Sequence, residues 1–345
     1  MNEPLRVVHV GCGSMAAVWL AAAVREPRIR IVGLVDVQGA AAEARRAEYV
    51  PDAGCFVDLN RALAEVKPDV VFNCTVPEAH ESVSISALAA GAHVLTEKPL
   101  AWSLHSANAI VAAAAREGRL LAVSQNYRYR AAPRTVREVL ATGLLGEVHT
   151  VTCDYWDALH FEGFRTTMRH PLLVEMSIHH FDLARFFGYE FRGLTSVQEW
   201  NPPGSWFTGG GSLCASFGTP PGCVFLYRAS WCAEGQATSG NGSWRFVGSR
   251  GSLEWDGADR IVAQTVRRTG GFKSELEDHR WPVQPAPGRE ASHASVITEF
   301  VDCVRHGGVP ETNGADNLRS LAMVCDCLQV LDLASAEKIA AAPNF

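Results

Sequence analysis

The sequence predicts an α/β protein with an N-terminal doubly wound parallel sheet and a C-terminal α+β domain whose large, open sheet is mainly antiparallel. Three observations support this prediction. In the first part of the chain, short β-branched runs alternate with alanine-rich stretches of helical length. A glycine-rich turn, GCGSMA at residues 11–16, joins the first run to the first helical stretch. From about residue 146, stretches with period-2 alternation follow one another and are broken by Gly and Pro.

The first part of the chain has the element order of repeated βαβ units. The expected strands are 6–10, 30–35, 55–57, 69–74, 93–96 and 120–125, and the expected helices are 15–25, 38–47, 58–65, 78–90 and 103–117. Right-handed crossovers between such strands give a parallel sheet with helices on both faces. We therefore expect a first domain at residues 1–125.

The second part of the chain consists mainly of successive strands. These are expected at 147–156, 195–200, 211–217, 223–231, 243–249, 251–255 and 261–266. Because short connections join them, an antiparallel or mixed sheet is favoured over further βαβ units. Two helices, expected at 291–306 and 315–334, close this second domain, which is predicted to span residues 126–345.

The composition excludes several classes of partner. The chain has 345 residues, 47% of them hydrophobic, and a formal net charge of −6, which argues against binding to nucleic acid. The apolar run at 109–115 is far too short to cross a membrane. Ten scattered cysteines without CxxC pairs indicate reduced thiols, so we expect a cytoplasmic protein with no membrane or nucleic-acid partner. No spacing typical of a metal site is present, and no metal is expected.

The turn GCGSMA lies where the first strand must become the first helix. Gly11 allows a tight turn, Gly13 lets the backbone approach a pyrophosphate, and Ala16 is the third small residue of a dinucleotide-binding fingerprint. The second strand ends in Asp36, where a carboxylate would accept hydrogen bonds from an adenosine ribose. The cofactor-binding candidates from this region are Gly11, Cys12, Gly13, Ser14, Met15 and Asp36.

Asp36 also bears on which dinucleotide binds. Its carboxylate would repel a 2′-phosphate, and Val37 and Gln38 supply no cation to offset the repulsion. Arg45 and Arg46 lie more than two turns further along the helix and are interpreted as part of a solvated face. NAD is therefore favoured over NADP.

Several local patterns resemble one family. They are AHVLTEKPLA (92–101), CTVPEAH (74–80), SQNYRYR (124–130), LLVEMSIHHFDLARFF (172–187) and the stretch FVDCVRHGGVPETNGADNLRSLAMV (300–324). With GCGSMA, they make nearly the whole chain similar to the Gfo/Idh/MocA oxidoreductases, the family of glucose–fructose oxidoreductase and inositol dehydrogenase. The resemblance implies an N-terminal NAD(P)-binding Rossmann domain and a C-terminal sheet that carries substrate residues and usually forms homodimers or homotetramers. It also implies hydride transfer between the nicotinamide and a secondary alcohol or ketone of a sugar, sugar derivative or cyclitol.

The resemblance assigns catalytic roles to three residues. Lys98 matches the lysine of EKP, His179 matches the acid/base histidine, and Glu175 stands where the family usually has Asp. A neutral imidazole suits removal of a hydroxyl proton, and a lysine cation would stabilise the developing alkoxide. Glu175 and His179 are at i and i+4, so on one α-helix the carboxylate would orient the imidazole. The longer Glu175, and the HPLLVEM approach without Gly-Gly, leave open whether activity is altered or lost.

Further candidates follow from position in the expected elements. The other predicted cofactor contacts are Thr75, Val76, Pro77, His80, Glu97, Lys98 and Asn126. The predicted substrate contacts are Arg128, Trp156, Asp157, His160, Arg165 and His180. His80 has an alternative role as a helix cap, and His180 as a packing residue. A cis Lys98–Pro99 bond would aim Lys98 into the cleft.

The sequence thus predicts an NAD(H)-dependent sugar or cyclitol dehydrogenase or reductase. Two alternatives remain. One is a glycosidase that oxidises its substrate transiently with NAD, and the other is a non-catalytic dinucleotide-binding regulator. Free reduced cofactor would accumulate with the dehydrogenase but not with the glycosidase, and EKP together with His179 argues against the regulator.

Overall fold

The computed structural model describes residues 3–219, 222–283 and 293–341, with side chains described as far as 333. The chain divides into two compact units. The first comprises Met1–Tyr129 and Pro287–Leu321, and the second comprises Arg130–Ala286 and Ala322–Phe345.

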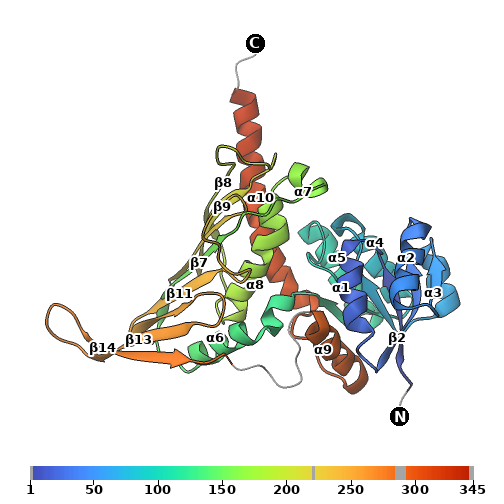
Figure 1. The fold of residues 1–345 in the computed structure, drawn as a ribbon, viewed down its shortest axis with the longest axis horizontal. Coiled ribbons are helices and arrows are strands. Elements are labelled where there is room, and N and C mark those ends of the chain that lie inside the picture. The colour runs from blue at the N-terminus through green and yellow to red at the C-terminus, as the bar shows by residue number, and fades with distance from the viewer. Residues whose placement is uncertain (1–2, 220–221, 284–292, 342–345) are drawn as a thin grey trace. The chain divides into compact units, whose positions relative to one another are not determined.

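The first unit contains a six-stranded parallel sheet with the order β3-β2-β1-β4-β5-β6 (Figure 1). Its strands are β1 (Leu5–Val10), β2 (Ile29–Val35), β3 (Gly54–Phe56), β4 (Val70–Asn73), β5 (His93–Thr96) and β6 (Leu121–Val123). Its helices are α1 (Ser14–Ala23), α2 (Gly39–Tyr49), η1 (Pro77–Ala79), α3 (Leu59–Val66), α4 (His80–Ala89), α5 (Leu104–Glu117) and η2 (Asn126–Tyr129). The doubly wound prediction is confirmed, and strand order reverses between β1 and β4, where such sheets bind ligands at their carboxyl ends.

The first unit also includes a helix from far along the chain, α9 (His293–His306). Val296, Ile297 and Phe300 form one apolar face of α9 and belong to the same buried core as Val7 of β1 and Trp19 of α1. Further along, Ala122 of β6 forms an antiparallel bridge with Asn313. The expected second domain included α9 and Asn313, whereas the structure places both in the first unit. The first two residues of the expected helix 291–306 lie outside the described residues.

The second unit contains an eight-stranded sheet with the order β14-β13-β12-β11-β7-β10-β9-β8. Its strands are β7 (Val148–Trp156), β8 (Leu194–Trp200), β9 (Ser212–Thr219), β10 (Cys223–Ser230), β11 (Ser243–Gly248), β12 (Gly251–Trp255), β13 (Ile261–Arg268) and β14 (Glu275–Trp281). All neighbouring strands are antiparallel except β7 and β10, so the predicted open, mainly antiparallel sheet is confirmed.

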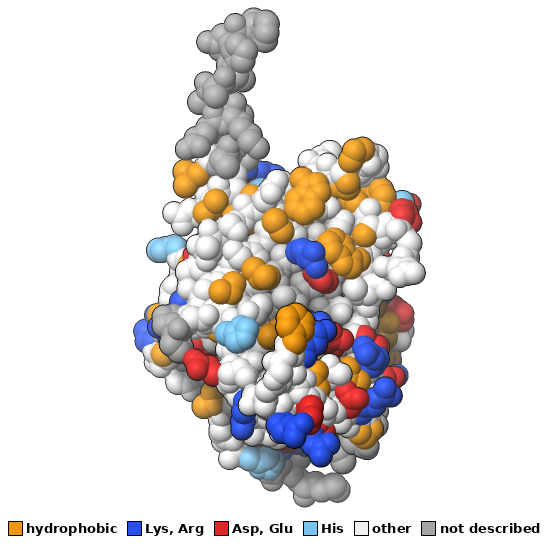
Figure 2. All heavy atoms as spheres, turned by 90° about the vertical axis from the view of Figure 1, so that its left-hand side faces the viewer, with side chains coloured by type: hydrophobic (Ala, Val, Ile, Leu, Met, Phe, Trp, Pro, Cys, Tyr) orange, Lys and Arg blue, Asp and Glu red, His pale blue; other side chains and the backbone are white. Residues whose placement is uncertain are grey.

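Helices cover one face of this sheet and leave the other open (Figure 1). They are α6 (Ala131–Ala141), α8 (Ile178–Phe186) and α10 (Gly314–Ala341), with the short α7 (Phe164–Thr167) and the π-helical turn η3 (Leu173–Ser177) before α8. On β10, Phe225 and Tyr227 point to the covered face and are buried, whereas Val224 and Leu226 are 38% and 43% exposed on the open face. Figure 2 shows this open side, where hydrophobic side chains lie among polar ones.

All ten cysteines are free thiols. In the part of the chain that the structure describes, helices are too short or too polar to span a bilayer.

Candidate functional site

The glycine-rich loop has the geometry of a phosphate cradle. Gly11 has φ +90°, and a Cβ there would lie 2.5 Å from the carbonyl oxygen of Cys74. Gly13 differs, because a Cβ built on it meets nothing within 4 Å. α1 begins at the next residue, and no side chain caps its first turn. An uncapped helix N-terminus with open space above Gly13 fits the pyrophosphate of a dinucleotide.

Asp36 lies beside this loop at the end of β2. Its Oδ2 accepts a hydrogen bond from the backbone N–H of Cys12 at 2.7 Å, and its Oδ1 accepts one from Gln38 at 2.8 Å. These two bonds fix the carboxylate at the edge of the loop. Each oxygen retains a lone pair for a ribose hydroxyl.

The spacing had indicated that Arg45 belongs to a solvated face, but in the structure it contacts the glycine-rich loop. Its guanidinium donates to the carbonyl oxygen of Gly13 at 3.1 Å and to Glu48 at 2.9 Å, and the side chain is only 23% exposed. The guanidinium of Arg45, on α2, therefore lies next to the glycine-rich loop. The adjacent Arg46 pairs with Glu43 on the outer side of α2.

The loops after β4 and β5 are joined by His80. Its ring nitrogens lie 2.8 Å from the carbonyl oxygen of Pro99 and 3.1 Å from that of Thr75. The ring is fully buried, and burial lowers the pKa of His80. In this structure His80 holds together two loops, the first of which contains Thr75, the exposed Val76 and Pro77. Its cofactor contact stays a prediction. The Lys98–Pro99 bond is cis, as predicted.

Glu97 lies under the second of these loops and is buried. Its Oε1 accepts hydrogen bonds from Trp19 Nε1 at 2.8 Å and from His293 Nε2 at 3.3 Å, and its Oε2 accepts one from the backbone N–H of Lys98 at 2.8 Å. Burial alone would raise the pKa of this carboxyl. The hydrogen bond from His293 and the charge of Lys98 outweigh burial, so the pKa lies below its ordinary value.

Two residues of the SQNYRYR stretch have different surroundings. Asn126 is nearly buried, and its Nδ2 lies 3.5 Å from Nδ1 of His293. Arg128 is also nearly buried, and its guanidinium forms an ion pair with Asp316 at 2.8 Å. This ion pair fixes the start of α10 within the first unit, and the substrate contact of Arg128 stays a prediction.

In the second unit, Glu175 lies in the π-helical turn that precedes α8. Its Oε2 accepts hydrogen bonds from Arg165 at 3.2 and 2.9 Å. The guanidinium of Arg165 also lies over the rings of Phe161 and Phe164. The expected single α-helix is therefore interrupted between Glu175 and His179, and His179, which is 8% exposed, falls in the first turn of α8. Such π-helical turns often occur at functional sites.

Both ring nitrogens of His180 have a partner within the second unit. Its Nδ1 lies 2.9 Å from the hydroxyl of Tyr227 and its Nε2 lies 3.1 Å from the carbonyl oxygen of Gly240. The ring is fully buried beneath the sheet, and burial lowers the pKa of His180 to about 4. Of the two roles that the sequence left open, the burial of His180 favours packing, and its substrate contact stays a prediction.

The remaining predicted substrate residues lie near one another around the end of β7. Trp156 donates its backbone N–H to Thr238, and Asp157 accepts from the backbone N–H of Ala158 at 2.9 Å. His160 is exposed, pairs with Glu234 at 2.9 Å and stacks on Trp206 with ring centroids 3.8 Å apart. Trp156 and Asp157 are half-buried, whereas His160 is exposed.

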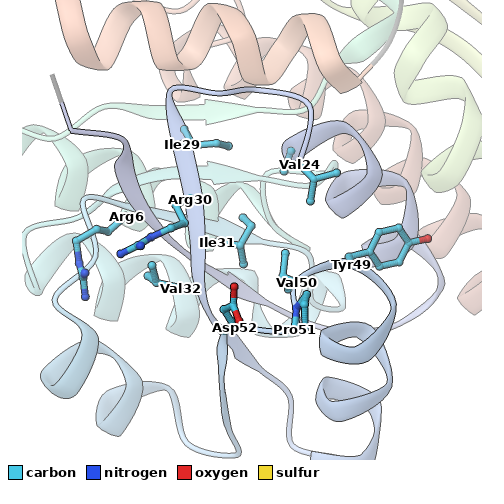
Figure 3. A pocket seen from close by; sticks show the side chains of 12 residues that line it. Arg6, Val24, Ile29, Arg30, Ile31, Val32, Tyr49, Val50, Pro51 and Asp52 are labelled. Atoms are coloured by element: carbon cyan, nitrogen blue, oxygen red, sulfur yellow. The ribbon is translucent and has the colours of Figure 1, made fainter. Parts of the chain in front are cut away.

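A pocket of about 510 Å³ lies near the amino ends of β1 and β2 in the parallel sheet. Arg6 and Arg30 extend into it from the amino ends of β1 and β2, and Tyr49 lies on the other side, at the end of α2 (Figure 3). Gly11 follows the carboxyl end of β1, so this pocket is not the cofactor site.

Sequence reasoning missed Trp19, His293 and the contact of Arg45. The tryptophan lies within an apolar helix pattern and gave no signal of a polar function. The histidine is the first residue of α9, 196 residues after its partner Glu97. Only the glycine-rich loop and the EKP stretch carried local signals.

Comparisons with known proteins agree with this architecture. A family model described as an oxidoreductase family with an NAD-binding Rossmann fold matches residues 5–125, and the GFO/IDH/MocA C-terminal domain matches residues 134–254. The D-apiose dehydrogenase of Paraburkholderia graminis is 26% identical over 292 residues, covering 78% of this chain and 72% of that protein. The inositol 2-dehydrogenase of an Arthrobacter species is 31% identical over 200 residues, covering 57% and 58%.

A solved structure extends the likeness to both units. The oxidoreductase from Agrobacterium radiobacter, solved in complex with NAD⁺, L-tartaric acid and magnesium, has a TM-score of 0.81 at 18% identity, covering 93% of this chain and 94% of that one. At this identity the likeness concerns the fold. The two family models together match well over half of the sequence. The chain therefore belongs to the Gfo/Idh/MocA family of NAD-binding oxidoreductases.

Proposed function

We propose that the protein transfers a hydride between NAD(H) and a secondary alcohol or ketone of a sugar, sugar derivative or cyclitol. The observation that carries the proposal is the carboxyl edge of the parallel sheet, where the open Gly13 cradle, Asp36 and the Glu97–Lys98 pair follow three strands. The names of the relatives, D-apiose dehydrogenase and inositol 2-dehydrogenase, support a polyhydroxylated substrate.

Lys98 is proposed to bind the substrate oxygen. The nicotinamide, when bound, supplies the acceptor or donor of the hydride. As an alcohol is oxidised, its oxygen gains alkoxide character, which a nearby ammonium group stabilises. The side chain is half-buried, and its backbone N–H is held by the buried Glu97 carboxylate, so the start of the side chain has a defined position.

His179 is proposed to remove or return the hydroxyl proton. The ring is 8% exposed and so largely shielded from bulk water, and an imidazole is the side chain that most often transfers protons near neutral pH. Glu175 is proposed as a positioning residue in the turn before α8. Its carboxylate forms an ion pair with Arg165 at 2.9 Å, which holds it in place.

NAD is proposed as the preferred cofactor over NADP. The Asp36 carboxylate is fixed at the loop edge by two backbone N–H groups and would repel a 2′-phosphate. Arg45 does not offset this charge directly, because its guanidinium is engaged by the Gly13 carbonyl and Glu48.

A substrate panel with active-site variants tests the proposal. Monosaccharides, cyclitols and glycosides are assayed with NAD and with NADP, using wild type, Lys98→Met, His179→Asn and the double variant. We expect NADH to accumulate with at least one free sugar or cyclitol, each single variant to lose about a hundredfold or more in kcat, and the double variant to lose less than the product. Wild-type turnover in both single variants would refute the site assignment.

The same panel separates the other functions. Cleavage of a glycoside without net NADH would indicate the glycosidase with transient oxidation. Tight NAD binding with no turnover of any compound would indicate a non-catalytic regulator.

We also propose that the chain forms homodimers or homotetramers through the open face of its eight-stranded sheet. Val224 and Leu226 are exposed there beside Thr150 and Thr152 of β7, and the Arg228–Asp154 ion pair continues the same register at 2.7 Å. A flat face with exposed apolar residues between small polar ones suits a second copy of the chain. Leu226→Glu should shift sedimentation toward the monomer, and an unchanged oligomer would refute this interface.

A further inference from the structure

The buried carboxylate of Glu97 connects parts of the first unit that are far apart in the sequence. Trp19 reaches it from α1, Lys98 from the loop after β5, and His293 from the first turn of α9. The rings of Trp19 and His293 also contact each other, with centroids 6.0 Å apart. Three N–H donors thus converge on one carboxylate that is only 6% exposed.

The geometry around His293 is consistent with one tautomer. Its Nε2 faces Glu97 Oε1 at 3.3 Å, so this nitrogen carries the hydrogen when it donates to the carboxylate. Its Nδ1 is then an acceptor and faces the amide nitrogen of Asn126 at 3.5 Å, the outer limit of a hydrogen bond. One imidazole therefore lies between two residues that the sequence assigned to cofactor binding.

Packing of α9 sets the place of this imidazole. Val296, Ile297 and Phe300 are buried in the core of the first unit, directly after the histidine. Near the middle of α9, Thr298 donates to Glu26 at 3.1 Å, and Arg28 bridges Glu26 and Asp302. α9 thus cannot shift along α1 without breaking both its apolar and its polar contacts.

We infer that His293 is a positioning residue for the nicotinamide end of the cofactor site, acting through Glu97 on Lys98 and through its contact with Asn126. Without the N–H donor of His293, the Glu97 carboxylate would keep its hydrogen bonds from Trp19 and from the Lys98 backbone but lose its link to α9. The start of the Lys98 side chain and the Asn126 amide would then be less defined. The catalytic part of this inference rests on the role proposed for Lys98.

Lysine spectroscopy tests the inference without cofactor turnover. The sequence contains four lysines, Lys67, Lys98, Lys273 and Lys338, so reductive ¹³C-methylation gives few NMR signals, and Lys98→Arg identifies the signal of Lys98. The test variants are His293→Leu, which removes both nitrogens, and His293→Gln, whose amide can donate to Glu97. His306→Gln, on the exposed last turn of the same helix, is the matched control.

We expect His293→Leu to move the Lys98 signal in cofactor-free protein and to weaken NADH binding, measured by calorimetry, by about 10- to 150-fold, the loss typical of one hydrogen bond to a charged group. His293→Gln should restore most of both, and His306→Gln should change neither. Trp19→Phe, which removes the other side-chain donor, should move the Lys98 signal in the same way.

An unchanged Lys98 signal and NADH affinity in folded His293→Leu would overturn the inference. Equal defects in His293→Leu and His293→Gln would also overturn it, because only packing would then be at work. Failure of the proposed function is a separate outcome. If Lys98→Met kept full turnover while His293→Leu weakened NADH binding and moved the Lys98 signal, the positioning role would stand and the catalytic role of Lys98 would fall.

Discussion

Gly11 and Gly13 belong to one loop, but the structure predicts opposite consequences when each is replaced by alanine. At Gly11 the new Cβ would lie 2.5 Å from the carbonyl oxygen and 2.6 Å from the carbonyl carbon of Cys74, both backbone atoms of the neighbouring loop. The φ of +90° is also unfavourable for alanine. At Gly13 the backbone has φ −70°, and a Cβ would meet nothing within 4 Å.

These differences predict different changes in the free energy of unfolding. Positive φ costs an L-residue about 1–2 kcal/mol, and forcing an extra carbon into packed backbone costs about 1–3 kcal/mol, so Gly11→Ala should destabilise the first unit by about 2–5 kcal/mol. For a unit of this size, that corresponds to a fall in Tm of roughly 5–15 °C. Gly13→Ala should leave the Tm of the cofactor-free protein within about 1 °C, because surface substitutions without strain change stability by about 0.5 kcal/mol or less.

For NAD binding, we expect the substitution at Gly13 to have a direct effect. The methyl group of Gly13→Ala would fill the space above the helix N-terminus, so the affinity for NAD should fall by tenfold or more, roughly the cost of losing one well-placed phosphate contact. Thermal unfolding of the cofactor-free protein and calorimetric titration with NAD measure the two effects separately. If Gly13→Ala lowered the Tm as much as Gly11→Ala, or left NAD affinity intact, the assignment of the open space to the pyrophosphate would be wrong.

Other variants test charges and burial. Arg45→Met should weaken NAD binding by about two- to fivefold, the effect of one partly exposed charge, whereas its partner variant Glu48→Gln should not weaken it. Asp36→Ser should raise the NADP to NAD affinity ratio by roughly tenfold, because it removes a like charge near the 2′ position, and parallel titrations measure the ratio. His180 has a pKa lowered to about 4 by burial, so the unfolded chain takes up its proton first as the pH falls below 6.5. Stability should then fall between pH 6.5 and 4 by up to about 1.4 kcal/mol per pH unit, and His180→Asn should flatten this dependence in pH-dependent unfolding.

The strands of both sheets were predictable because burial leaves a periodic trace in the sequence. Parallel strands buried on both faces appear as apolar runs, and half-buried strands such as β7 alternate apolar and polar residues. β14 was not predicted, because its residues are mostly charged and exposed, and only backbone pairing with β13 defines it as a strand. α6 was also absent from the expected elements, although it starts directly after η2.

The candidate site was predictable only where chemistry is encoded by neighbours in the chain. Gly11 and Gly13 are recognised from their spacing and from the strand before them. His80 and His180 have the residue type of functional groups, yet both are fully buried with backbone carbonyls beside their rings. A sequence shows that a histidine is present, but its exposure is a property of the packed fold.

Asn126 and Arg128 show the same limit within a single stretch. They stand two residues apart, and sequence position gave both to a ligand site. In the structure, one faces His293 of α9 and the other pairs with Asp316 at the start of α10, and both partners come from the 287–321 segment. That segment explains why the surroundings of Asn126 and Arg128 cannot be read from residues 1–125 alone. Glu97 and Asn126 both have His293 as a partner, nearly two hundred residues later in the chain. A domain boundary drawn after the sixth strand therefore separates these proposed cofactor residues from the side chain that holds them in place.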